Sequence, residues 1–137
     1  MHSFGLINGF LERVKMKKVF RSEADVKAAV KQALASYPAT WYFMPYMSGY
    51  GRSGVPDFVG CFQDRFFAIE TKFAKNKPTP AQKMELKKIH ESLGVAMIIN
   101  ETNLDILEEV LEDLALGLYT HARSLSRSTL LSYGVEI

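Results

Sequence analysis

The sequence predicts a single α/β (α+β) domain, in which helices pack on a small mixed sheet. The length of 137 residues is usual for one domain. The composition, 47% hydrophobic and 23% charged, is typical of globular proteins and excludes a largely disordered chain. Helical and strand spacings of apolar residues alternate in the order α-β-β-β-α-β-α. Many folds share this order, so it predicts an architecture and no function.

The first helix and the first strand are predicted before residue 48. Ser22 is a good N-cap, and apolar residues follow it at intervals of three and four, which predicts a helix to about Ser36. Pro38 ends this helix. Residues 40–47 are rich in aromatic side chains and predict a strand, where Pro45 indicates a sheet edge or a bulge.

A β-hairpin is predicted next, from strands over 57–62 and 65–72 joined by a turn at Gln63-Asp64. Asp57 lies six residues before Gln63, and Glu70 lies six residues after Asp64. A hairpin with this turn therefore brings Asp57 opposite Glu70.

The remaining elements are a helix, a strand and a further helix. Thr79 and Gln82 have the spacing of a capping box and begin a helix over 79–93. Residues 95–100 are a short apolar run that predicts a strand, and 103–118 have the pattern of an acidic amphipathic helix.

These elements define a domain over 21–118 with a segment on either side. Residues 1–20 are interpreted as an N-terminal extension, helical or flexible, that docks on the domain or serves dimerisation. Met16-Lys17-Lys18 also suits an internal start, in which case residues 1–15 are dispensable. Residues 119–137 are expected to form a loosely structured tail with room for one short helix.

The net charge of +2 hides an uneven distribution. Residues 1–100 hold fifteen Lys and Arg against eight Asp and Glu, whereas residues 101–137 hold two against seven. The charge is therefore +7 in the first part and −5 in the second. This split suggests an anionic partner such as nucleic acid, and a solvated basic surface is the ordinary alternative.

Several classes of protein are excluded. A single cysteine, Cys61, rules out an intramolecular disulfide and a cysteine-based zinc site, and it favours a reducing, cytoplasmic location. No apolar run approaches the ~20 residues of a membrane span, so no membrane partner is expected. Residues 49–54 match G-x-G-x-x-G, but a strand follows them instead of a helix, so no nucleotide cofactor is predicted.

Glu70 and Lys72 are the strongest candidates for chemistry. Two residues apart on one strand, they share a face of the sheet. The carboxylate offers hard oxygen ligands for Mg²⁺, and the ammonium can orient an attacking water or stabilise charge on a phosphate. The alternative is a salt bridge at the rim of the sheet.

Two further acids point to the same place. Asp57 follows Pro56, and opposite Glu70 the two carboxylates repel unless a cation lies between them. Glu23 shares the helix face that should meet the sheet, where it would need a partner. The alternatives are a turn residue for Asp57 and, for Glu23, a favourable position at a helix N-terminus.

Polar residues on neighbouring loops are candidates for DNA binding. Arg52 and Ser53 lie in the Gly-rich loop before Asp57, and Lys75 and Lys77 follow the strand that carries Glu70. The loop with Arg52 and Ser53 can wrap a phosphate backbone or close over a substrate. Lys75 and Lys77 can contact phosphates, and solvated surface is the ordinary alternative for these two lysines.

Glu23, Gly54-Val55-Pro56-Asp57, Glu70-Thr71-Lys72 and Pro78-Thr79-Pro80-Ala81-Gln82 together resemble the PD-(D/E)xK nuclease superfamily. The branch most similar is VRR-NUC, the virus-type replication-repair nucleases, and the likeness covers about residues 21–100. It implies a restriction-endonuclease-like core, an α-β-β-β-α-β mixed sheet flanked by helices.

The resemblance also implies roles for individual residues. Glu23, Asp57, Glu70 and the carbonyl of Thr71 would hold Mg²⁺, or Mn²⁺ in its place. Lys72 would position or activate the water, and Gln82 would support the site, although the capping box alone explains Gln82.

The resulting hypothesis is a Mg²⁺-dependent DNA endonuclease, homodimeric and specific for branched DNA such as Holliday junctions. A phage-encoded enzyme acting in its host cell is one setting. Two alternatives remain: another nuclease of the superfamily, of restriction type or acting on single strands or flaps, and a non-catalytic nucleic-acid-binding module.

Overall fold

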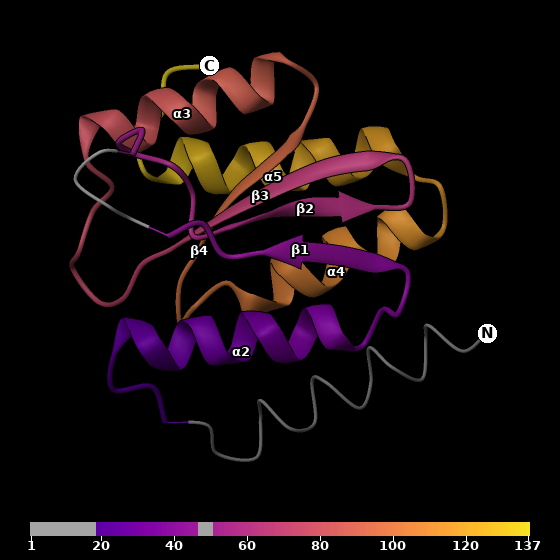
Figure 1. Cartoon of the computed structure of the whole chain (residues 1–137), viewed down its shortest axis with the longest axis horizontal. Coiled ribbons are helices and arrows are strands. Elements are labelled where there is room, and N and C mark those ends of the chain that lie inside the picture. Colours follow the sequence, from indigo (N-terminus) through magenta and orange to yellow (C-terminus); the bar gives the residue numbers. More distant parts are fainter. Residues whose placement is uncertain (1–18, 47–50) are drawn as a thin grey trace.

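The computed structural model describes residues 19–46 and 51–137, which form one four-stranded sheet and four helices (Figure 1). The strand order is β1-β2-β3-β4, with β1–β2 and β2–β3 antiparallel and β3–β4 parallel. This mixed α+β architecture confirms the predicted fold class and fits a restriction-endonuclease-like layout. The elements are α2 (Glu23–Ala35), β1 (Thr40–Phe43), β2 (Phe58–Phe62), β3 (Arg65–Thr71), α3 (Pro80–Glu91), β4 (Val95–Ile99), α4 (Leu104–Ala115) and α5 (Tyr119–Ser132).

The hairpin of β2 and β3 has the register that the sequence predicts. Phe58 pairs with Ile69 and Phe62 with Arg65. Gln63 adopts a left-handed φ of 57° in the turn between them. Asp57, one residue before β2, is therefore level with Glu70 near the end of β3.

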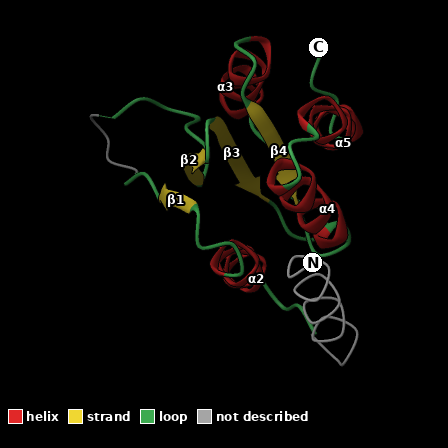
Figure 2. Ribbon diagram, turned by 90° about the vertical axis from the view of Figure 1, so that its right-hand side faces the viewer, coloured by secondary structure: helices red, strands yellow, loops and turns green. Residues whose placement is uncertain are grey.

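The sheet is covered on both faces, but to different extents (Figure 2). Phe67 and Ile69 of β3 belong to the larger core, which α2 and α4 close on one face. The smaller core lies on the other face, where Leu86 of α3 and Leu130 of α5 contact Ala96 and Ile98 of β4. Because β3 alternates between these two faces, Glu70 lies on the face of α3, level with Ile98.

The C-terminal segment differs from the expectation of a loose tail. Tyr119–Ser132 is the 14-residue helix α5, which packs on β4 and α4, so residues 119–137 pack with the domain over 21–118. The sequence does not show the apolar periodicity of a helix here, because Ser126 and Thr129 occupy buried positions where hydrophobic residues are expected.

Helix α5 also seals the outer edge of β4. The Ile98 amide donates a hydrogen bond of 3.0 Å to the Thr129 hydroxyl, which donates to the Ser126 carbonyl at 2.7 Å. The side chain thus satisfies a backbone group that an edge strand would otherwise expose.

Strand β1 is shorter than predicted. It ends at Phe43, and Met44, Pro45 and Tyr46 have left the sheet. Pro45 has no amide to donate and limits the strand. The predicted residue 47 and most of the N-terminal extension, residues 1–18, lie outside the described residues. Within residues 19–46 and 51–137, no helix is long and apolar enough to cross a membrane.

Candidate active site

Glu70 and Lys72 lie together at the end of β3, as the sequence predicts. Both are buried, with exposures of 1% and 8%, and Lys72 Nζ is 3.2 Å from Glu70 Oε2. The other oxygen, Oε1, is buried and has no hydrogen-bond partner among the described residues. This is no rim salt bridge, because the pair is shielded from water and one carboxylate oxygen remains unsatisfied.

Asp57 is fixed beside this pair by Thr71. The Thr71 amide and hydroxyl both donate to Asp57 Oδ2, at 2.9 and 2.6 Å. Asp57 and Glu70 are close enough that the charge of Asp57 helps to raise the pKa of Glu70. The two acids that the hairpin register predicted as neighbours are therefore brought together.

Gly54 holds the loop that delivers Asp57 against the start of α3. Its φ is +80°, and a Cβ there would lie 2.5 Å from the carbonyl carbon and oxygen of Ala81. Only glycine fits this combination of a left-handed backbone and a close approach. Pro56 is buried in the same loop. The backbone that leads to Asp57 is therefore constrained at both Gly54 and Pro56.

Glu23 is linked to the site by Lys27, which lies near both Glu23 and Asp57. Lys27 was not among the residues selected from the sequence. Lys27 Nζ lies 3.5 Å from Glu23 Oε2 and 3.8 Å from Asp57 Oδ1. The Glu23 side chain is about one third exposed, so it lies at the open side of the cluster. Glu23 is also among the charges that raise the pKa of Glu70. The signal for Lys27 was its i, i+4 spacing from Glu23.

Burial and nearby acids change the ionisation of Glu70. Its pKa is raised from 4.5 to about 7, first by burial and then by the charge of Asp57. The charge and hydrogen bond of Lys72 lower it, but by less. A carboxylate in this environment is stabilised by an added cation.

The described residues contain no group of three His, Cys, Asp or Glu side chains arranged to hold a metal ion as they lie. The donor set nevertheless fits a hard divalent cation. Asp57 and Glu70 offer carboxylate oxygens that lie close enough to interact, and Glu70 Oε1 has no hydrogen-bond partner within residues 19–46 and 51–137. The Thr71 amide and hydroxyl both donate to Asp57. The metal-binding role predicted for Thr71 involves a third group, its carbonyl oxygen.

Gln82 forms the capping box that the sequence predicts. The Thr79 hydroxyl accepts from the Gln82 amide at 3.1 Å, and the Thr79 amide donates to Gln82 Oε1 at 2.9 Å. The Gln82 backbone also lies against Gly54 of the loop before Asp57. Gln82 therefore supports the site at least through the start of α3.

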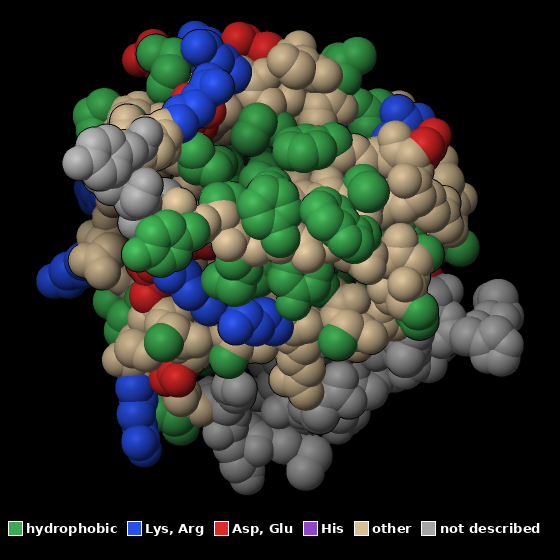
Figure 3. All heavy atoms as spheres, in the orientation of Figure 1, with side chains coloured by type: hydrophobic (Ala, Val, Ile, Leu, Met, Phe, Trp, Pro, Cys, Tyr) green, Lys and Arg blue, Asp and Glu red, His purple; other side chains and the backbone are tan. Residues whose placement is uncertain are grey.

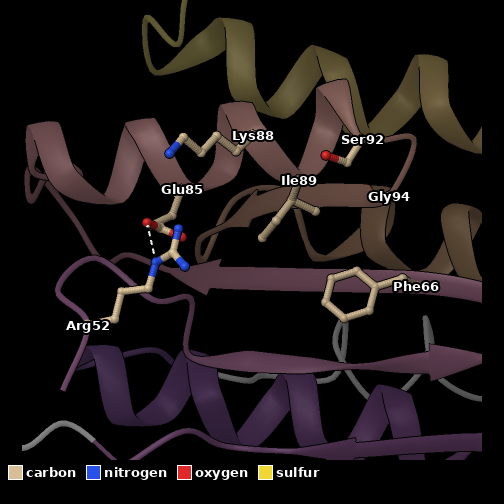
Figure 4. A pocket seen from close by; sticks show the side chains of 7 residues that line it. All are labelled: Arg52, Phe66, Glu85, Lys88, Ile89, Ser92 and Gly94. Atoms are coloured by element: carbon tan, nitrogen blue, oxygen red, sulfur yellow. Dashed lines mark hydrogen bonds and ion pairs between the residues drawn. The ribbon is translucent and has the colours of Figure 1, made fainter.

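Of the predicted DNA-binding residues, Arg52 forms an ion pair with α3 and the other three are exposed. Arg52 Nε lies 2.9 Å from Glu85 Oε2 on α3, while Ser53, Lys75 and Lys77 are exposed. Figure 4 shows this ion pair in a cleft of about 470 Å³ between α3 and β3. Its described lining is Arg52, Phe66, Glu85, Lys88, Ile89, Ser92 and Gly94, so the cleft lies beside the carboxylate cluster and does not contain it.

Comparison with known proteins adds no relative to this picture. No family model matches the chain, and no curated protein is similar to it. The interpretation of the cluster therefore depends on its own residues and geometry.

Proposed function

We propose that this chain is a Mg²⁺-dependent DNA endonuclease that hydrolyses phosphodiester bonds, with branched DNA such as Holliday junctions as its substrate. The observation that carries the proposal is the buried Glu70, with Asp57 near it and Lys72 at 3.2 Å. One Glu70 oxygen has no hydrogen-bond partner in the part of the chain that the structure describes. A buried carboxylate with a second, partly buried carboxylate near it is costly without a cation to balance the charge.

The residues divide the work of such a reaction. Asp57, Glu70, Glu23 and the Thr71 carbonyl would hold Mg²⁺, or Mn²⁺ in its place. A bound ion would supply positive charge to the phosphate and lower the pKa of a water molecule. Lys72, oriented by Glu70, would hold the attacking water and stabilise charge as the phosphate reacts.

The exposed cations support a nucleic-acid substrate. Lys75 and Lys77 follow β3 directly and are free to meet the phosphates that flank the scissile bond. Ser53 lies on the loop before Asp57, and Arg52 would contribute if DNA drew it from Glu85. The proposed setting is the cytoplasm, including that of a phage-infected host.

Cleavage of a panel of labelled DNAs tests the proposal. The panel contains a four-way junction, a flap, a plain duplex and a single strand, each with Mg²⁺ and with EDTA. We expect Mg²⁺-dependent cutting of the junction, and at least a ~100-fold loss of rate in Lys72→Ala and Glu70→Gln. Lys31→Ala, an exposed lysine on α2, is the matched control.

Cutting that persists in EDTA, or that Lys72→Ala leaves intact, would contradict the proposal. Cutting of the plain duplex at one sequence, or of the flap or single strand alone, would instead favour another nuclease of the same superfamily.

One feature supports a second candidate, a nucleic-acid-binding module without catalysis. Lys27 and Lys72 together pair with all three acids and can balance part of their charge. Calorimetric titration with Mn²⁺ separates the candidates. If the chain is a nuclease, it should bind Mn²⁺ and Asp57→Ala should abolish that binding. If it is a binding module, Asp57→Ala should leave the affinity for Mn²⁺ unchanged.

A further inference from the structure

One face of the sheet carries an uncovered group of apolar side chains, here called the open sheet face and defined as Trp41, Phe43, Val59, Cys61 and Phe66. Trp41, Cys61 and Phe66 form one row across β1, β2 and β3, and Phe43 and Val59 belong to the next. Trp41 is 62% exposed, Phe43 49% and Phe66 47%. Figure 3 shows hydrophobic side chains gathered over the middle of this face.

The cause of the exposure is the incomplete cover on the side of α3. The alternating residues of β2, Phe58 and Phe62, point into the core under α2 and α4 and are fully buried. On the other face α3 contacts β3 and β4, and no helix among residues 19–46 and 51–137 covers β1 and β2 there (Figure 2). Soluble chains rarely leave a contiguous apolar surface of this kind without a partner.

The composition of the open sheet face indicates a protein partner. None of its five residues is charged, and its aromatic rings adjoin, with Trp41 and Phe43 centroids 5.7 Å apart. Aromatic enrichment with loss of charge marks the centre of protein interfaces. A surface for stacked nucleobases places cations between its aromatic side chains, whereas Arg52 and Lys88 lie at the border of this face, in the cleft beside Phe66.

The exposed apolar area supplies a large part of what a dimer interface needs. An aromatic side chain offers roughly 200 Å², so the three exposed rings alone leave roughly 300 Å² of apolar surface to bury. Partly exposed Ile89 of α3, which lines the same cleft as Phe66, extends it. A standard interface needs roughly 800 Å² from each partner, of which more than half is apolar.

We propose that the open sheet face binds a second copy of this chain in a two-fold symmetric dimer. The row is self-complementary, because a large ring flanks the small Cys61 on each side. A two-fold axis along β2 brings Trp41 of each copy over Phe66 of the other and sets the two Cys61 side chains opposite each other. Phe66 borders the cleft under α3, which offers the incoming indole a pocket.

The choice of a second copy rests on the proposed function. A four-way junction is symmetric, and resolving it requires a cut in each of two strands, so two identical active sites are needed. Glu70 and the open sheet face lie on the same side of the sheet. A dimer formed through this face therefore holds its two sites in one rigid assembly.

The sequence supplies two reporters, since its one tryptophan and its one cysteine both lie in the central row. We expect sedimentation of the full chain to give a dimer at micromolar concentration. On dilution, Trp41 emission should shift to the red as the indole becomes exposed to water. A short bis-maleimide should link Cys61 to its symmetry mate, and Cys61→Ser should abolish the link. A linker is required, because facing sheets lie ~10 Å apart, beyond the reach of a disulfide.

Variants locate the interface. Trp41→Arg and Phe66→Arg should each weaken dimerisation at least 30-fold, as expected for central interface residues. Leu116→Arg is the matched control: Leu116 is 59% exposed at the end of α4, outside the open sheet face. Circular dichroism checks that every variant is folded.

A monomer at high concentration would overturn this proposal, and so would a dimer that resists both arginine variants. Loss of Trp41 emission on adding single-stranded DNA to such a monomer would assign the face to nucleobases instead.

The dimer proposal can fail or hold independently of the nuclease proposal. Dimerisation requires neither Mg²⁺ nor DNA and should survive Glu70→Gln. The folded Trp41→Arg variant should still cut individual strands of a junction, but it should no longer make the paired cuts that resolve the junction.

Discussion

Glu70 is buried with a second carboxylate beside it, so its ionisation opposes folding when no metal is bound. Its pKa of about 7 exceeds the ordinary value of 4.5. For a group whose pKa is raised in the folded state, the stabilisation is complete below the unfolded pKa and is lost as pH rises through the folded pKa. The metal-free protein should therefore lose stability between about pH 4.5 and pH 7 for this reason.

Glu70→Gln isolates this effect, because glutamine stays neutral at every pH. In EDTA, the free energy of unfolding of the variant relative to the wild type should rise by up to about 3 kcal/mol between pH 4.5 and pH 8. Urea unfolding at several pH values measures it, with the exposed Glu109→Gln as a control. If the free energies of unfolding of Glu70→Gln and wild type change with pH in parallel, ionisation of Glu70 does not destabilise the fold.

Gly54 makes a second prediction at this scale. Gly54→Ala adds both a strained φ and a Cβ 2.5 Å from the Ala81 backbone, so the loop must move away from α3 and carry Asp57 with it. We expect a loss of Mg²⁺-dependent cleavage of at least ~10-fold and a lower melting temperature. Gly117→Ala is the matched control, because Gly117 has a φ of +77° but its added Cβ would meet no atom of the described residues within 4 Å. Equal effects of the two substitutions would mean that the contact with Ala81 does not position Asp57.

The sequence predicted those site contacts that depend on local geometry. The Asp57–Glu70 register follows from a two-residue turn, and the Thr79–Gln82 capping box follows from spacing within one helix. The bridge from Lys27 to Asp57 and the Arg52–Glu85 pair were not predicted. Both join segments whose approach is set by packing of helices on the sheet, which no local pattern records.

Among the elements, α5 shows how a polar side chain can replace the usual protection of a sheet edge. Thr129→Val keeps the shape of the side chain but leaves the Ile98 amide without its acceptor in a buried position. The cost should be about 1–3 kcal/mol of unfolding free energy, measured by chemical denaturation. Thr129→Ser, which retains the hydroxyl, should recover most of this loss. Equal destabilisation by valine and serine would assign the effect to packing.

The same element limited the prediction of secondary structure. Residues 103–118 showed an apolar stripe and form α4, Leu104–Ala115, whereas the buried face of α5 includes Ser126 and Thr129. Their hydroxyls are satisfied by carbonyls within the helix and by β4. Polar residues that are buried only because they have such partners look like surface residues in a sequence.

At the scale of the whole molecule, the two signs of charge lie on different elements of one unit. Five of the seven acids after residue 100 belong to α4, which covers the sheet face opposite Glu70. The lysines after β3 lie at the end of the sheet that carries the carboxylate cluster. This separation keeps the acids of α4 away from the face of the sheet that carries Glu70.

If Lys75 and Lys77 contact phosphates, the dependence of DNA affinity on salt will report it. For duplex arms, each neutralised phosphate contributes a slope of about −0.9 to the plot of log K against log salt concentration. Lys75→Ala and Lys77→Ala should each make the slope shallower by about that amount and weaken binding to all DNA structures similarly. Arg127→Ala, an exposed cation on α5, should leave it unchanged. Fluorescence anisotropy in EDTA measures the slopes without cleavage, and slopes that neither lysine alters would move the DNA to another surface.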